Sequence, residues 1–245
     1  MTQSENVVRI AAVGDVHCNT TSQGELQPLF TQANEQADVL LLCGDLTDYG
    51  LPEEVQILLE ELSVVQIPTL AVMGNHDYES GKAEDMRQLL AESGVKLLDG
   101  ESCEVAGVGF AGVKGFAGGF GSKMLQPWGE DSIKQFVHEA VEESLKLESA
   151  LAKLETKQRV AVLHYSPIQE TVEGEPLEIL PFLGSSRLEE PLNRFSVAFA
   201  LHGHAHHGYV EGKTSSGVPV YNVSMPLLKK HFPNQPPFRL LEVSV

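Results

Sequence analysis

The sequence predicts an α/β protein built around a parallel sheet, because three features of its first half agree. Hydrophobic runs alternate with amphipathic stretches in the order β-α-β-α-β-α. One run, Val39-Leu40-Leu41-Leu42, is apolar at every position, which is typical of a strand covered on both faces. Turns containing glycine follow the runs. This alternation favours parallel strands joined by right-handed crossovers.

In the first half, β-branched and apolar runs indicate strands, whereas a spacing of three or four residues indicates helices. Pro52 fits the first turn of a helix, where its missing N–H removes no hydrogen bond, and apolar residues on one face follow it. The expected order is a strand at 7–13, a helix at 26–36, a strand at 38–43, a helix from Pro52, a strand at 69–73 and a helix at 82–93.

The second half changes character. Gly107 and Gly109 interrupt β-type residues between positions 101 and 113, which predicts a hairpin. Residues 115–129 form a long glycine-rich stretch with the only tryptophan, Trp128, near its end, and loops of this length are often functional, so we expect a lid. The remaining expectation is a helix at 132–157, a strand at 159–163, an irregular segment at 166–191, a strand at 197–201 and antiparallel strands over the last forty residues.

Composition restricts the possible partners and location. The net charge of −17 disfavours a nucleic-acid polymer, but a small anion held by bound cations is compatible with it. Three cysteines without a CxxC motif suit a reducing compartment. Residues 1–6 lack the features of a signal peptide, and no apolar run approaches the roughly 20 residues that span a bilayer. We expect one cytoplasmic domain, residues 1–245, without a membrane partner; the oligomeric state stays open.

Oxygen and nitrogen donors follow five of the hydrophobic runs, where ligands of open α/β sheets gather. They are Asp15, His17, Asp45, Asn75, His164, His204 and His206. Mixed carboxylate and imidazole donors without a thiolate suit manganese, iron or zinc in a catalytic site. Seven donors exceed what one catalytic metal uses, so we expect two transition-metal ions about 3.5–4 Å apart. Asp45, midway in the set, could bridge them.

As a set, these residues resemble the five motifs of the calcineurin-like metallophosphoesterases. The motifs are Asp15-x-His17, Gly44-Asp45, Gly74-Asn75-His76-Asp77, His164 and Gly203-His204-x-His206. The resemblance implies a four-layered α/β/β/α sandwich of mixed sheets flanked by helices. It also implies two metal sites, one formed by Asp15, His17, Asp45 and His206 and the other by Asp45, Asn75, His164 and His204.

The resemblance further implies a reaction in which a hydroxide bridging the metals attacks phosphorus. His76 would protonate or stabilise the leaving oxygen, and Asp48 would orient His76. The chain departs from the family pattern at Cys18, where glycine is frequent. It also has Asp48-Tyr49-Gly50 where protein Ser/Thr phosphatases have Asp-Arg-Gly, which counts against a phosphoprotein substrate. The motifs look more like the bacterial phosphodiesterase branch.

The expected function is therefore hydrolysis of a small-molecule phosphodiester, such as a cyclic nucleotide. Two alternatives are a nuclease of the same superfamily, which the acidic charge disfavours, and a catalytically inactive scaffold or binding protein, which the complete motif set disfavours. The sequence leaves three nearby side chains open. His202 could support the site or not, and Arg187 and Arg194 could either clamp a phosphate or pair with Glu189 or Glu190.

Overall fold

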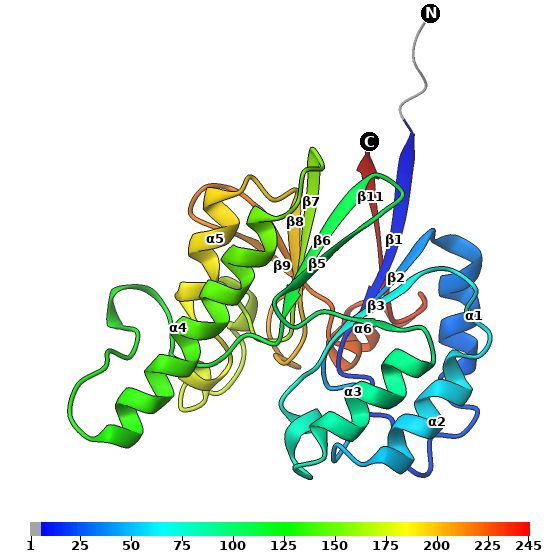
Figure 1. Ribbon diagram of the computed structural model, residues 1–245, viewed down its shortest axis with the longest axis horizontal. Coiled ribbons are helices and arrows are strands. Elements are labelled where there is room, and N and C mark those ends of the chain that lie inside the picture. Colours follow the sequence, from blue (N-terminus) through cyan, green and yellow to red (C-terminus); the bar gives the residue numbers. More distant parts are fainter. Residues whose placement is uncertain (1–5) are drawn as a thin grey trace, which may run out of the picture.

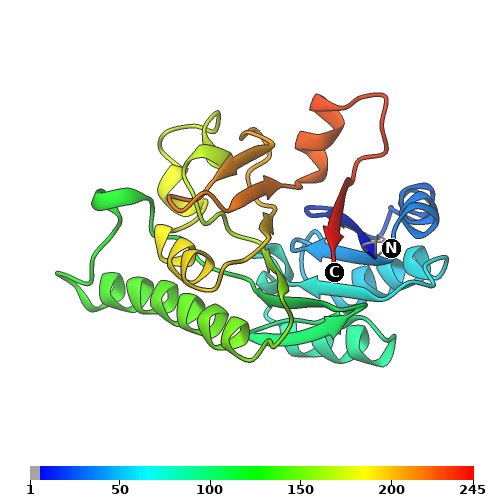
Figure 2. The same ribbon diagram turned by 90° about the horizontal axis from the view of Figure 1, so that it is seen from above.

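Two sheets lie face to face with helices on both outer faces, which confirms the expected α/β/β/α sandwich (Figures 1 and 2). The computed structural model describes residues 6–245. The expectation that residues 1–6 lack the features of a signal peptide therefore concerns residues that, apart from Asn6, lie outside the described part. Among residues 6–245, no helix is both long enough and apolar enough to cross a bilayer.

The first sheet has the order β11-β1-β2-β3-β4. Its parallel strands are β1 (Val7–Val13), β2 (Val39–Cys43), β3 (Thr69–Val72) and β4 (Lys96–Leu97), and β11 (Arg239–Ser244) pairs antiparallel with β1. The helices α1 (Gln27–Gln36), α2 (Pro52–Leu62) and α3 (Ala83–Glu92) pack on its outer face. The predicted β-α-β-α-β-α order is confirmed in this half.

The second sheet has the order β5-β6-β7-β8-β10-β9. The predicted hairpin is present as β5 (Glu101–Val105) and β6 (Val108–Val113), and the other strands are β7 (Gln158–Leu163), β8 (Phe199–His202), β9 (Glu211–Lys213) and β10 (Pro219–Asn222). Strands β6, β7, β8 and β10 run parallel to one another. The long helix α4 (Asp131–Ala152) and the short α5 (Glu189–Arg194) cover the outer face.

The last forty residues differ from the expectation of antiparallel strands alone. Strand β10 pairs parallel with β8, and a helix, α6 (Met225–His231), lies between β10 and β11. Pro226 at the start of α6 is a sequence signal for a helix N-terminus. The helix has only 7 residues, however, which are too few to show a clear helical periodicity. The helix expected at 132–157 ends at Ala152, although Leu154 beyond it is still buried.

Strand β2 shows how the layers are joined. Leu40 and Leu42 pack against α1 and α2, whereas Leu41 on the opposite face belongs to the core between the two sheets. All five β2 residues are buried, as expected for a central parallel strand. This arrangement brings the carboxyl ends of β1, β2, β3, β7 and β8 to one edge of the sandwich (Figure 1).

Candidate metal centre

The seven predicted donors lie together in the loops that follow these strand ends. The loop after β1 runs beside the loop after β2, because Asp15 N donates to Gly44 O at 2.9 Å and His17 N donates to Asp45 O at 3.1 Å. His164 follows β7 directly. The backbone N–H of His204, beyond β8, donates to both carboxylate oxygens of Asp15 at 2.9 and 3.0 Å. Main-chain contacts therefore fix these loops against one another.

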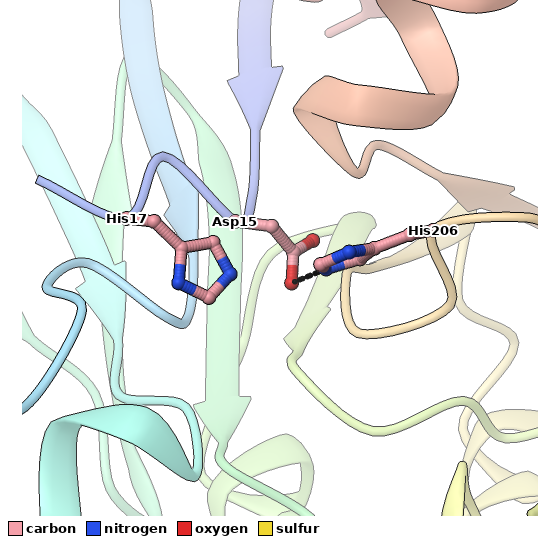
Figure 3. Close-up of side chains that lie close together, drawn as sticks. All are labelled: Asp15, His17 and His206. Atoms are coloured by element: carbon pink, nitrogen blue, oxygen red, sulfur yellow. Dashed lines mark hydrogen bonds and ion pairs between the residues drawn. The ribbon is translucent and has the colours of Figure 1, made fainter.

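The donors form two groups whose ligand atoms lie within 4.8 Å of one another. The first group is Asp15, His17 and His206, whose side chains point toward one another (Figure 3). The second group is Asp45, His164 and His204. Asn75 lies at the second group, with Oδ1 3.0 Å from His164 Nε2. His17 Nε2 lies 3.8 Å from Asp45 Oδ2, so the two groups are contiguous.

Four of the donors have backbone angles that residues with side chains rarely adopt. The φ values are 54° at Asp15, 44° at His17, 46° at Asp45 and 68° at His204. A left-handed conformation costs a residue with a Cβ roughly 1–2 kcal/mol. Such conformations persist where surrounding contacts enforce them, and they cluster at functional sites. Four of the six non-glycine residues with positive φ in the described part of the chain are thus predicted donors.

The glycines of the motifs allow these loops to approach closely. A Cβ on Gly74 would lie 2.1 Å from Asp45 Oδ1, and a Cβ on Gly203 would lie 2.5 Å from Asp15 Oδ2. No side chain fits at either position without moving a carboxylate. Glycine is therefore required by contact with the neighbouring loop.

The buried carboxylates and imidazoles stabilise one another's charge. Burial opposes ionisation of Asp45, but the charge of His164 outweighs it and holds the pKa of Asp45 below its usual value. Burial likewise opposes protonation of His164, yet the negative charges of Asp45 and Asp15 raise the pKa of His164 to about 9. Asp15, fully buried, has a lowered pKa because the hydrogen bond from His206 and the charge of His164 outweigh its burial. The site therefore favours positive charge beside its carboxylates.

Hydrogen bonds to carbonyl groups assign one ring nitrogen on each of two histidines. His164 Nδ1 lies 3.0 Å from Cys43 O, and His204 Nε2 lies 3.2 Å from Phe182 O. Since a carbonyl oxygen only accepts, these nitrogens carry the protons. In the neutral form that binds a metal, the opposite nitrogens, Nε2 of His164 and Nδ1 of His204, would carry the lone pairs.

His17 provides the test of whether this pocket suits a metal. Both of its ring nitrogens are buried and have no hydrogen-bond partner among the described residues. Buried polar atoms are nearly always satisfied, so an imidazole that makes no hydrogen bond and lies 3.8 and 3.3 Å from the carboxylates of Asp45 and Asp48 suits a site for a cation. The oxygen and nitrogen donor set suits a catalytic transition metal. The residues present therefore fit metal ions.

His76 lies beside these groups. Its ring centroid is 4.7 Å from that of His17, and it forms a third group of potential ligands with His17 and Asp45. His76 Nδ1 donates to the main-chain oxygen of Asp48 at 2.7 Å. The carboxylate of Asp48 instead lies 3.3 Å from His17 Nδ1. The expected contact from Asp48 to His76 is thus made by the backbone carbonyl and not by the side chain.

Asp77, the last residue of the Gly-Asn-His-Asp motif, is a positioning residue that the sequence did not single out. Its buried carboxylate accepts from Leu46 N at 3.1 Å, from Thr47 N and Oγ1 at 2.9 and 2.8 Å, and from Gly74 N at 2.8 Å. Burial and the charge of Asp45 raise its pKa to about 6. Asp77 ties the turn after β2 to the turn after β3.

His202 supports the turn after β8 and does not face the donors. Its Nδ1 donates to Gly203 O at 2.7 Å and its Nε2 accepts from the Thr171 hydroxyl at 2.8 Å. Burial lowers its pKa to about 4, so it is neutral. Asn222 holds the same turn, since its Nδ2 donates to Ala205 O at 2.7 Å. Thr171 and Asn222 lie outside the five motifs, and no sequence signal pointed to them.

The two arginines considered as phosphate clamps have other partners. Arg187 Nη2 donates to Leu125 O at 3.0 Å, and Arg194 pairs with Glu148. The alternative expectation, pairing with Glu189 or Glu190, is also not what the structure shows.

Comparison with known proteins places this geometry in a family. The model of the calcineurin-like phosphoesterase family matches residues 8–208. The chain is 24% identical over 174 residues to a probable glycerophosphodiester phosphodiesterase of Arcobacter nitrofigilis, covering 69% of this chain and 56% of that one. It is 32% identical over 82 residues to a 3′,5′-cyclic-nucleotide phosphodiesterase of Nostoc sp., covering 29% and 31%. The chain thus spans about half or less of these relatives.

Solved structures agree on the fold. The phosphopantetheinyl hydrolase of Mycobacterium tuberculosis superposes with a TM-score of 0.68 at 16% identity, covering 95% of each chain. The protein TT1561 of Thermus thermophilus superposes with a TM-score of 0.59 at 13% identity, covering 98% of this chain and 99% of that one. The family match covers every predicted motif, so the chain belongs to the calcineurin-like phosphoesterase family.

Proposed function

We propose that this protein binds two transition-metal ions and hydrolyses a small-molecule phosphodiester, such as a cyclic nucleotide. The observation that carries the proposal is the pair of contiguous donor groups at one edge of the sandwich. Two relatives named as phosphodiesterases support the choice of a diester. The net charge of −17 supports a small substrate over a nucleic-acid polymer. One domain over residues 1–245 and a cytoplasmic location stay predictions.

Each donor group would hold one ion, and Asp45 would contact both. The proposed ligands are Asp15, His17, Asp45 and His206 for one ion and Asp45, Asn75, His164 and His204 for the other. Manganese, iron or zinc bound there would polarise the phosphoryl group and generate a nucleophile from water. The strained loops and the Asp77 tether would hold the donors in place before the substrate binds.

His76 is proposed as the general acid for the leaving oxygen. The hydrogen bond from its Nδ1 to Asp48 O fixes the ring and leaves Nε2 free to hold a proton. The His76 side chain is 35% exposed, so a substrate can reach it. Its backbone N–H donates to Asp45 Oδ1 at 2.9 Å, which holds it beside the proposed bridging carboxylate.

A substrate panel on the manganese-loaded protein tests this function. We expect bis(p-nitrophenyl) phosphate and cyclic nucleotides to be hydrolysed faster than p-nitrophenyl phosphate, and single-stranded DNA to be a poor substrate. Preferred cleavage of DNA would instead indicate a nuclease. No turnover of any ester by metal-loaded protein would indicate an inactive scaffold and would contradict the proposal.

A further inference from the structure

An apolar cavity of about 450 Å³ lies on the side of the second sheet that carries α4. Most of its wall comes from three segments. They are the 115–129 loop with Gly119, Phe120 and Leu125, helix α4 with Phe136, and the short 3₁₀ helix Leu180–Phe182. The polar side chains in its lining are Lys123 and Gln169. A cavity of this size and composition is typical of a site for a small organic molecule.

The cavity borders the second donor group. Phe182, in its wall, accepts a hydrogen bond at its carbonyl from His204 Nε2 at 3.2 Å. Phe120 and Leu180, also in the wall, pack against a small apolar cluster that contains Ala205, the residue between His204 and His206. The segment 204–206 therefore carries two proposed metal ligands, and residues that lie beside this segment form part of the cavity wall. A molecule held at the metals by its phosphate would have the cavity beside it.

The wall formed by the 115–129 loop is anchored in this structure. Gly118 N donates to Pro181 O at 2.8 Å, and Gly119 N donates to Gly184 O at 2.9 Å. Gly121 N donates to Ser186 Oγ at 2.9 Å. Together with the bond from Arg187 to the Leu125 carbonyl, these contacts hold the loop against residues 181–187. The cavity is thus preformed, and the expected role of the loop as a lid stays a prediction.

Resting on the function proposed above, we propose that this cavity receives the organic group of the phosphoester. The substrate class is then esters of an alcohol bearing an alkyl or aromatic group, and esters of small polyols such as glycerol fit less well. Phe182, in the wall and bonded to His204, is 56% exposed, so an apolar group placed against it would bury its ring. Apolar burial is favourable in proportion to the area removed from water.

Alkylphosphonates test this inference directly, because their P–C bond cannot be hydrolysed and each carries one organic group. Binding of methylphosphonate and n-hexylphosphonate to the manganese-loaded protein is measured by calorimetry. Burying one methylene fully changes an equilibrium about fourfold, so half-burial of five additional methylenes gives about 30-fold. We expect hexylphosphonate to bind about 30-fold more tightly than methylphosphonate.

Two variants locate the effect in the cavity, and a third is the control. Leu125→Gln and, independently, Leu180→Gln place an amide in the wall, so each should lower the affinity for hexylphosphonate and leave that for methylphosphonate unchanged. Leu177→Gln is the matched control, because Leu177 is 78% exposed and is not part of the lining. It should change neither affinity. Circular dichroism verifies that each variant is folded.

The inference and the proposed function fail in different ways. Equal affinity for both phosphonates, or a chain-length effect that survives in the folded cavity variants, would overturn the cavity assignment even if diesters are hydrolysed. A chain-length effect lost in the cavity variants, in a protein that hydrolyses no ester, would support the cavity and refute the proposed activity.

Discussion

Replacing Gly74 with alanine should inactivate the protein without removing any donor atom. The new Cβ would lie 2.1 Å from Asp45 Oδ1 and 2.2 Å from Asp45 N. Contacts between such atoms shorter than 3.0 Å essentially never occur, so one of the two turns must move by about 1 Å. A displacement of that size can lower the rate about 10²-fold. Overpacking costs roughly 1–3 kcal/mol, which lowers Tm by about 2–4 °C per kcal/mol in a chain of this size.

The assay for Gly74→Ala measures kcat on bis(p-nitrophenyl) phosphate, metal content by elemental analysis and Tm by calorimetry. Gly81→Ala is the matched control, because Gly81 lies near Gly74 in sequence and has a φ of +73°. Apart from its immediate neighbours in the chain, no atom of the described residues lies within 4 Å of the Cβ that alanine would add there. It should lower Tm through backbone strain but keep kcat. Wild-type kcat in Gly74→Ala, or an equal loss in Gly81→Ala, would refute the steric reasoning.

Two other substitutions separate the chemistry from the scaffold. His76→Ala should lower kcat by about 10²–10⁴-fold for a diester with an alkoxide leaving group and less for p-nitrophenolate, with both metals retained; release of a metal ion would make His76 a ligand. Glu61→Ala should lower the unfolding free energy by about 3 kcal/mol and leave metal content unchanged. The reason is that the buried Glu61 carboxylate accepts from the N–H groups of Gly24, Leu26 and Gln27 at 2.6, 2.7 and 3.0 Å. A calorimetric Tm equal to that of the wild type would contradict this stabilising role of Glu61.

The sequence predicted the parts of the fold and site whose signals are local. Asp15 and Asp45 each follow a buried strand closely, and parallel strands bring such residues to one edge without further information. Contacts between distant segments were not predictable in this way. Thr171 forms a hydrogen bond with His202, 31 residues away in the sequence. Neither the residue type of Thr171 nor its spacing from His202 distinguishes it from other threonines.

Contacts made by main-chain atoms could not be predicted from the sequence either. The carbonyl of Asp48 bonds His76, and because every residue carries a carbonyl, the residue type could not reveal which group makes the contact. The parallel pairing of β10 with β8 was missed for a related reason. A short strand has the same alternation in either direction, so only its neighbours in space decide the pairing.

Metal stoichiometry tests the central claim most directly. After loading with manganese and removal of free ions, elemental analysis should find about two ions per chain in the wild-type protein. Asp45→Asn should retain fewer ions and lose activity at the same time, because Asp45 is proposed to contact both metals. One ion or fewer in the wild-type protein would contradict the dinuclear centre, and two ions retained in Asp45→Asn would contradict the contact of Asp45 with both metals.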